Sequence, residues 1–301
     1  MRKLIVGMLV AVLVLVLVPL AVLAKPDMDK PLPATGVELV QKVTLRGKPG
    51  GVGGGKSVNQ AATGVLGASS SGETYAIIVG ISDYPGTAND LQYSDDDAQD
   101  VYNALTTLYG YGAGNVHLLL DLDASFAAIQ SAINDVESQE VAGDEVVFFF
   151  SGHGTKGVAN DGDTEKTDEA IVCHDGNPSG SLMAIWDGQL RDWFADFDSS
   201  RIVFIFDSCL AGGMTDLKAP GRVINMACSE GGLSYESGFW QNGQFTYFFV
   251  DQGMLTAKAD RYDNITGVAD VTVEEAFDYA KANCQVQKPA ITDSFDDDLL
   301  L

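Results

Sequence analysis

The chain contains a thiol and an imidazole in settings that suit nucleophilic catalysis. Cys209 ends the sequence Asp-Ser-Cys, which follows the apolar run 202–206. His153 lies in the sequence Ser-Gly-His-Gly, which follows the apolar run 146–150. A thiol is mostly protonated near neutral pH, and a neighbouring imidazole can convert it into the more nucleophilic thiolate. The two residues therefore predict a cysteine nucleophile with a histidine base, provided that the fold brings them together.

The two apolar runs predict the elements that would position this pair. Both runs are too short for most helices, and their Val, Ile and Phe content is typical of strands buried on both faces of a sheet. In an open parallel sheet, functional groups gather at the carboxyl ends of neighbouring strands. Two adjacent strands would thus deliver His153 and Cys209 to the same edge.

Further strands and helices alternate along the chain from residue 75 onwards. Apolar runs predict strands at 75–81, 116–120 and 222–227, with shorter strand-like pieces around Ile171 and Met183. Apolar residues at helical spacing predict helices at 91–109, 125–136, 186–197, 245–254 and 273–283. This alternation predicts an α/β fold with a mostly parallel sheet that helices cover on both faces.

The composition is that of a folded and strongly acidic protein. The chain has 301 residues, 46% of them hydrophobic and 9% aromatic, which is enough for one sizeable α/β domain with an extension. The formal net charge of −24 argues against a nucleic-acid partner, because proteins that bind nucleic acids are normally basic. The same charge favours cationic substrates or divalent cations as partners.

The first 72 residues differ from the rest of the chain. Residues 1–24 combine a basic start with a long apolar run, which predicts a signal peptide or, if uncleaved, a membrane anchor. Either alternative predicts an exported protein, secreted or anchored to the outer face of the cytoplasmic membrane. Residues 25–72 are rich in Gly, Ser, Lys and Pro and predict a linker or pro-region, which leaves 73–301 as the folded domain.

Residues 50–57 of this pro-region match the phosphate-binding pattern G-x-x-x-x-G-K-[ST]. A phosphate-binding loop of this kind needs a buried strand before it and a helix after it. Here a Lys-Pro pair precedes the pattern, and a stretch rich in Gly and Ser follows it. We therefore expect no nucleotide site at this segment.

The four cysteines leave the disulfide pattern open. In an oxidising compartment they could form two bridges. If Cys209 is a reactive thiol, however, the other three allow at most one bridge. Those three are Cys173, Cys228 and Cys284.

The two strand-end sequences resemble those of the caspase-like cysteine peptidases. Cys209 follows His153 by 56 residues (209 − 153), close to the caspase separation of about 50 residues. The acid before the cysteine resembles the metacaspase branch, because true caspases carry Gln-Ala-Cys. Residues 75–84, 91–98 and 243–247 also resemble parts of that family. The sequence departs from the metacaspase pattern at Leu210, where His is usual, and at Ser94, where Cys is common.

This resemblance, which covers residues 75–301, has implications for the fold and the catalytic groups. It implies a caspase-like three-layer α/β/α sandwich whose mostly parallel central sheet has about six strands. It also implies that Cys209 is the nucleophile, that His153 is its base, and that the backbone amides of Cys209 and Gly154 form an oxyanion hole. A glycine at 154 suits the close approach of a backbone amide to the substrate.

The resemblance to metacaspases also implies a substrate pocket made by Asp97, Ser151 and Asp207. Carboxylates there would pair with an Arg or Lys side chain, whereas true caspases need Arg in the same pocket to hold Asp. The structural alternative is that Asp207 caps the following helix and that Asp97 is one of the acids favoured at a helix N-terminus.

An acidic loop at 160–169 is the third feature with chemical meaning. It is not an EF-hand, because Lys166 stands where that loop needs Gly. The resemblance nevertheless implies an activating calcium ion, since hard oxygen ligands suit that ion, and no organic cofactor. The implied ligands are Asp168, Glu169, Asp187 and Asp216. The alternative is a solvated acidic loop without an ion.

These features together predict a monomeric cysteine endopeptidase that cleaves peptides or proteins after Arg or Lys. Two alternatives remain: the same fold with specificity for Asn or Asp, as in legumain-like or caspase-like relatives, or a non-catalytic caspase-like module that binds partners. An enzyme with basic specificity could also process itself. The candidate sites are Lys218 and Arg222 after the nucleophile, and Arg46, Lys48 and Lys56 in the pro-region.

Overall fold

The computed structural model describes most of the chain, namely residues 26–47, 60–162, 164–176, 182–260 and 270–301. The predicted signal peptide or anchor at 1–24 and the Gly-rich pattern at 50–57 lie outside these residues. Across the described ranges, we find no helix with the length and apolar character needed to cross a membrane.

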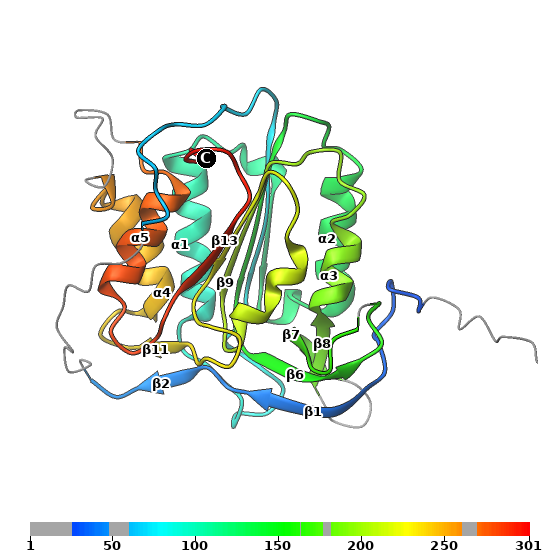
Figure 1. The fold of residues 1–301 in the computed structure, drawn as a ribbon. Helices are drawn as coiled ribbons and strands as arrows, with labels where there is room; N and C mark the ends of the chain where they lie inside the picture. Colours follow the sequence, from blue (N-terminus) through cyan, green and yellow to red (C-terminus); the bar gives the residue numbers. More distant parts are fainter. Residues whose placement is uncertain (1–25, 48–59, 163, 177–181, 261–269) are drawn as a thin grey trace, which may run out of the picture.

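A six-stranded sheet forms the centre of the molecule, in the order β13-β10-β9-β5-β3-β4 (Figure 1). Neighbouring strands are parallel, except that β13 runs antiparallel to β10. The predicted mostly parallel sheet of about six strands is confirmed. In chain order the strands are β3 (Thr74–Gly80), β4 (Val116–Leu120), β5 (Glu145–Ser151), β9 (Ile202–Asp207), β10 (Arg222–Met226) and β13 (Ala290–Asp293).

Helices cover both faces of this sheet, so the three-layer prediction is also confirmed (Figure 1). One face packs against α1 (Ser94–Thr107), α5 (Val273–Asn283) and the π-helix η4 (Tyr247–Leu255). The other face packs against α2 (Phe126–Glu137) and α3 (Asp187–Trp193).

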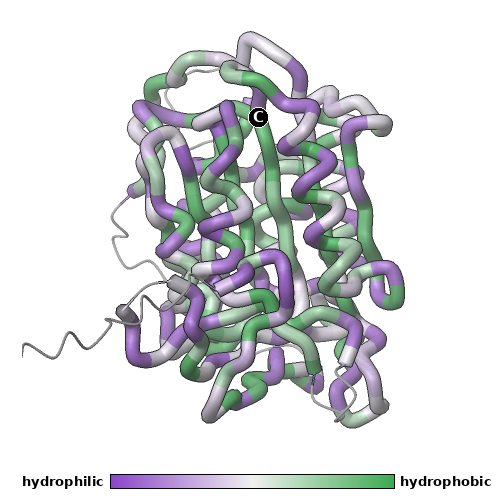
Figure 2. Tube along the Cα trace, turned by 90° about the vertical axis from the view of Figure 1, so that its right-hand side faces the viewer, coloured by the Kyte–Doolittle hydropathy of each residue, from purple (hydrophilic) through white to green (hydrophobic). Residues whose placement is uncertain are grey.

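The strands of the sheet supply both cores because their side chains alternate between the two faces. In β5, Phe148 and Phe150 join the core under α2 and α3, whereas Val147 and Phe149 join the core under α1 and α5. All four side chains are buried. Figure 2 shows hydrophobic stretches running through the middle of the molecule, whereas hydrophilic residues are frequent at its periphery.

Capping groups set the starts of the first two long helices. Ser82 Oγ accepts the backbone N–H groups of Ser94 and Asp95, and α1 therefore begins at Ser94 rather than at the predicted residue 91. The helix α2 begins after Ser125, whose Oγ accepts the N–H of Ala128.

Two other helices differ from their predictions. The α-helix predicted at 245–254 is mostly a π-helix, since only α4 (Gln244–Thr246) is α-helical before η4 begins. The helix predicted at 186–197 ends at Trp193, as α3. The described residues also form two single-turn 3₁₀ helices, η1 (Ala113–Asn115) and η2 (Asp121–Asp123), and a longer 3₁₀ helix, η3 (Ala211–Leu217).

Two smaller sheets lie at one end of the central sheet (Figure 1). The first is antiparallel, in the order β1-β6-β7-β8. Its strands are β1 (Ala34–Val40), β6 (Gly154–Ala159), β7 (Asp168–Gly176) and β8 (Leu182–Trp186). The second has the order β12-β11-β2, with strands β2 (Val43–Leu45), β11 (Tyr235–Ser237) and β12 (Asn242–Gly243).

The segment predicted as a linker or pro-region contributes β1 and β2 to these sheets. β1 pairs with β6 antiparallel, and β2 pairs with β11 in parallel. Farther along, backbone N–H groups of residues 61–64 donate to the carboxylates of Asp278 and Asp298. The described parts of this segment are therefore packed against the folded domain at two places.

Candidate active site

The strands β5 and β9 are neighbours that end at the same edge of the central sheet. Ser151, the last residue of β5, pairs with Asp207, the last residue of β9. His153 and Cys209 each follow two residues later. The structure thus places both residues at the carboxyl edge of the parallel strands, where their sequence context predicted them.

Gly154 packs directly against the backbone of Cys209. A Cβ atom at residue 154 would lie 2.1 Å from the carbonyl oxygen of Cys209, which is too close for any side chain. Glycine at this position therefore lets the start of β6 approach the nucleophile. An oxyanion hole made from the amides of residues 154 and 209 requires their backbones to lie close together, as they do here.

The Cys209 thiol is buried and bonded to the backbone. Its Sγ donates to the carbonyl oxygen of Gln41 at 3.3 Å and accepts the N–H of Ser234 at 3.2 Å. Burial raises the pKa of this thiol to about 11, so it is protonated in this arrangement. Leu210 has a φ of 62°, a left-handed conformation that turns the chain directly after the nucleophile.

Both ring nitrogens of His153 have backbone partners. Nε2 lies 2.7 Å from the carbonyl oxygen of Asn89, and Nδ1 accepts the backbone N–H of Lys42 at 3.1 Å. These partners fix the tautomer with the proton on Nε2 and the lone pair on Nδ1. The ring also stacks on Tyr84, and burial lowers the pKa of His153 to about 4. The pair is therefore a neutral imidazole and a neutral thiol in this state.

The three residues predicted to form a substrate pocket do lie together, beside this pair. Asp97 Oδ2 accepts the Ser151 hydroxyl at 2.7 Å, and Asp97 Oδ1 accepts the backbone N–H of Gly243 at 2.8 Å. Asp207 Oδ2 accepts the hydroxyl and the backbone N–H of Thr246. Asp207 thus does not cap the helix that follows it. Asp97 is one of the acids in the first turn of α1, as the structural alternative expected, and it is also buried in this cluster.

The occupant of this pocket is Lys42, from the two-residue link between β1 and β2. Its Nζ lies 3.1 Å from Asp97 Oδ2, 3.2 Å from Asp207 Oδ1 and 2.9 Å from Ser151 Oγ. The side chains of the lysine and of both acids are fully buried. Burial favours the neutral amine, but the carboxylates of Asp207 and Asp97 outweigh it and hold the pKa of Lys42 above its ordinary value.

The sequence did not point to Lys42 as a functional residue. The predicted processing sites in the pro-region are Arg46, Lys48 and Lys56. Lys42 differs from them in standing between two short strands, and its partner Asp97 lies 55 residues away. Arg46 is exposed, whereas residues 48 and 56 lie outside the described part of the chain.

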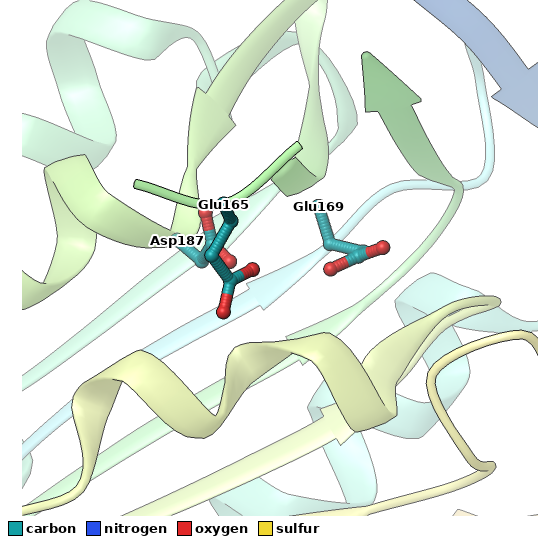
Figure 3. A group of neighbouring side chains, drawn as sticks. All are labelled: Glu165, Glu169 and Asp187. Atoms are coloured by element: carbon teal, nitrogen blue, oxygen red, sulfur yellow. The ribbon is translucent and has the colours of Figure 1, made fainter. Parts of the chain in front are cut away.

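A second group of acids consists of the buried Glu169 and Asp187 and the exposed Glu165. One carboxylate oxygen of each lies within 4.8 Å of the others, and Figure 3 shows the three side chains pointing towards a common space. We call these residues the acidic cluster. Glu169 belongs to β7, Asp187 begins α3, and Glu165 lies in the loop before β7.

The acidic cluster has the properties of a site for a cation. Glu169 Oε2 and Asp187 Oδ2 are buried, and neither bonds to a hydrogen-bond donor among the described residues. Burial raises the pKa of Glu169 to about 7, with Glu230 adding to the effect, and burial together with Asp161 raises the pKa of Asp187. Carboxylate oxygens without donors suit a hard cation such as calcium.

Two of the four predicted calcium ligands lie outside the acidic cluster. Asp168 Oδ2 accepts the backbone N–H of Ala159 at 2.7 Å, and Asp216 pairs with Arg191 at 2.7 Å. Glu169 and Asp187 are the two predicted ligands that come together. Glu165 completes the group, although the sequence analysis placed it only in the acidic loop.

The cysteines form no bridge with one another in the structure. Cys173, Cys209, Cys228 and Cys284 are all free thiols, so the structure contains neither the two bridges nor the single bridge that the sequence left open. Cys228 is buried next to the nucleophile, where its Sγ donates to the carbonyl oxygen of Ser208 at 3.3 Å.

Comparison with known proteins identifies the family. The caspase domain family matches residues 73–299. Metacaspase-4 of Arabidopsis thaliana is 34% identical over 149 residues, which cover 47% of this chain and 34% of the relative. Metacaspase-1 of Saccharomyces cerevisiae is 28% identical over 155 residues, which cover 48% of this chain and 35% of the relative. The matched region spans about a third of each of these relatives.

Solved structures show the same fold at lower sequence identity. A protein of Geobacter sulfurreducens superposes with a TM-score of 0.54 at 17% identity, covering 73% of this chain and 93% of its own. The Drosophila initiator caspase Dronc superposes with a TM-score of 0.51 at 13% identity, covering 87% of this chain and 97% of its own. The resemblance noted in the sequence is therefore confirmed, and the chain belongs to the caspase domain family of cysteine peptidases, with metacaspases among its relatives.

Proposed function

We propose that the chain is a cysteine endopeptidase that cleaves after Arg or Lys. The observation that supports this most directly is the buried pocket of Asp97, Asp207 and Ser151, which holds the ammonium group of Lys42. A pocket that accepts one cationic side chain of the chain itself has the charge and depth for a cationic substrate residue. Asp207 stands two residues before the nucleophile, which links the pocket to the reacting centre.

The arrangement of the pair gives each residue a role in acyl transfer. His153 keeps its proton on Nε2 against Asn89, so Nδ1 is the nitrogen that would take the thiol proton. The thiolate of Cys209 attacks the substrate carbonyl, forming a C–S bond, and the amides of residues 154 and 209 stabilise the oxyanion. His153 returns the proton to the departing amine as the C–N bond breaks. Water then hydrolyses the thioester, and the thiol reforms.

The alternatives receive less support from the pocket. An Asp substrate side chain would meet two carboxylates and no compensating Arg, and an Asn side chain would leave the buried acids without a counter-charge. A non-catalytic binding module would not need a thiol and an imidazole at adjacent strand ends. Both groups are retained here with Gly154 beside them.

We propose calcium as an activating ion, bound by Glu165, Glu169 and Asp187. A Cβ atom on Gly213 would lie 2.2 Å from Glu169 Oε2, so the acidic cluster packs against η3. This helix begins two residues after Cys209. Calcium at the cluster would neutralise charge beside the element that follows the nucleophile. No organic cofactor enters the proposed reaction.

We also propose that the enzyme processes itself, and the exposure of each basic residue decides which of the predicted sites are accessible. The position of Arg222 soon after the nucleophile suggested a loop. In the structure, however, Arg222 is the first residue of β10. It is buried, and its guanidinium donates to the carbonyl groups of Leu217 and Phe194. Lys218 and Arg46 are exposed and are the better candidates. Finding no new terminus after either residue in active protein would contradict this proposal.

We propose that residues 1–24 direct export of the protein, either released or held at the outer face of the membrane, and that the folded domain acts as a monomer. The basic start and the apolar run support export. Fractionation of expressing cells tests the location, and light scattering of purified protein tests the monomer.

Fluorogenic peptides ending in Arg, Lys, Asp or Asn test the proposed activity. We expect cleavage after Arg and Lys, raised by calcium over a chelator, and a loss of about 10³-fold or more in Cys209→Ala. Exclusive cleavage after Asp or Asn would keep the nucleophile and overturn the pocket. Unchanged cleavage by Cys209→Ala would overturn the nucleophile itself.

A further inference from the structure

Residues 39–45 run directly through the active site and are here called the blocking segment. On one side, Leu39 and Val40 pair with the first residues of β6, which starts immediately after His153. On the other side, Val43 pairs with Tyr235 of β11 and donates its N–H to the carbonyl oxygen of Ser234. The blocking segment thus adds a strand to a sheet on each side of the catalytic pair, a mode in which extended peptides bind.

The middle of the blocking segment contacts the two reactive atoms of the catalytic pair, Cys209 Sγ and His153 Nδ1. The peptide unit that joins Gln41 to Lys42 lies between the two residues, with its oxygen 3.3 Å from Cys209 Sγ and its N–H 3.1 Å from His153 Nδ1. The thiol therefore donates its hydrogen to the carbonyl oxygen of Gln41, and the lone pair of His153 Nδ1 accepts the N–H of Lys42. A substrate cannot reach either atom while this peptide unit is in place.

The side chain of Lys42 fixes the blocking segment in the cleft. Its ammonium contacts two buried carboxylates and one hydroxyl, and withdrawing it would leave both acids buried without a cation. Because the lysine is part of the same chain, its effective concentration at the pocket is high, and a free substrate must compete with it.

The register of the blocking segment differs from that of a substrate cut after the pocket residue. Such a substrate would present the bond that follows the pocket residue to the thiol. Here the bond that precedes Lys42 contacts the catalytic pair, and the N–H of the following residue, Val43, is bonded to Ser234. The pocket is thus filled without the bond after Lys42 being offered for cleavage.

From these contacts we infer that the blocking segment is a built-in inhibitor that holds the enzyme in a latent form, with Lys42 as its anchoring residue. This inference rests on the proposed function of the pocket, and it concerns how access to that pocket is regulated. Activation then requires the segment to leave the cleft, which frees Sγ of Cys209 and Nδ1 of His153 together.

The test compares the full chain with Lys42→Ala, Lys42→Met and Lys42→Arg, using Lys30→Ala as a matched control. Lys30 belongs to the same region, but its exposed ammonium pairs with Asp27 far from the pocket. Two rates are measured on each protein: alkylation of Cys209 by iodoacetamide, read by mass spectrometry, and cleavage of a short peptide substrate that ends in Arg.

We expect both rates to rise at least about tenfold in Lys42→Ala and Lys42→Met, because the segment loses its buried ion pairs. Lys42→Arg and Lys30→Ala should stay near the wild-type rates. Lys42→Met keeps the apolar stem of the lysine and removes only its charge. If the alanine variant does not fold, the comparison is made with the methionine variant.

The two rates separate failure of the inference from failure of the proposed function. Equal alkylation rates in the wild type, Lys42→Ala and Lys42→Met would overturn the inference, even if all of them cleave after Arg. Faster alkylation in the variants, with no cleavage after Arg or Lys by any protein, would support the blocking role and overturn the proposed specificity.

Discussion

The molecule has two groups of carboxylates with different surroundings, the fully buried pocket and the partly buried acidic cluster. In the pocket, Asp97 and Asp207 share the ammonium of Lys42, at 3.1 Å and 3.2 Å. In the acidic cluster, oxygens of Glu165, Glu169 and Asp187 lie within 4.8 Å of one another. There the pKa of Glu169 rises to about 7, as expected for a buried acid among like charges.

The difference indicates what each group is built to bind. A buried carboxylate is stable as an anion only when a cation or several donors compensate it. The pocket is fully buried in this state and holds a cation on a flexible apolar stem. The acidic cluster offers oxygens from three elements to one point, which suits a metal ion better than a side chain. We therefore propose substrate selection as the role of the pocket and ion binding as the role of the acidic cluster.

The largest expected effect comes from removing one charge of the pocket. In the Lys42→Ala background, Asp97→Asn should lower kcat/KM for an Arg substrate by about 100-fold, because a buried charge pair is broken. The preference for Arg over its neutral isostere citrulline should shrink by a similar factor. Competition assays with the two peptides measure this preference.

A matched control for that variant is Asp135→Asn on α2, where the acid is exposed and pairs with His117. It should leave both kcat/KM and the preference unchanged. Loss of activity in Asp97→Asn without any change in the preference would mean that Asp97 only supports the fold.

Calcium should stabilise the protein through the acidic cluster. At 100 times its dissociation constant, a ligand adds about 2.7 kcal/mol to the free energy of unfolding. We therefore expect calcium to raise Tm by several degrees, an increase that Glu169→Gln and Asp187→Asn abolish and that Asp135→Asn retains. Differential scanning fluorimetry with calcium or a chelator measures the shift. The same increase in all variants would place the ion elsewhere.

The smallest expected effect is on the titration of the nucleophile. Burial raises the pKa of Cys209 to about 11, so alkylation of the wild type should increase with pH throughout the range from 7 to 10. Lys42→Ala removes a cation that lowers this pKa, but releasing the segment also removes burial, which has the larger effect and raises it. The alkylation profile should therefore move to lower pH by about one unit or more. Coincident profiles for the two proteins would show that the segment does not control the thiol.

Much of the fold follows from local sequence patterns. The apolar runs that became β3, β5 and β9 are bounded within a residue or two of their prediction, because strands buried on both faces need continuous apolar side chains. The positions of His153 and Cys209 follow from the same runs, since both residues stand directly after a strand end. The π-helix η4 left no such signal, because its apolar residues are compatible with an α-helix.

The parts of the site that the sequence did not predict depend on contacts between distant residues. Lys42 meets His153 across 111 residues, and nothing in its own neighbourhood distinguishes it from the other lysines of the pro-region. The choice of Glu165 over Asp168 and Asp216 likewise depends on how the loop before β7 packs against α3. Asp168 accepts a backbone N–H and Asp216 pairs with Arg191. Neither contact could be predicted from the residues next to these acids in the sequence.

Mapping the cleavage sites tests most directly whether the protein is a cysteine peptidase with a pocket for basic side chains. The Lys42→Ala protein is incubated with a mixture of unrelated peptides in calcium, and the new C-termini are identified by mass spectrometry. We predict that these termini are Arg and Lys and that they disappear in Lys42→Ala combined with Cys209→Ala. Termini at Asp or Asn, or cleavage that persists without Cys209, would contradict it.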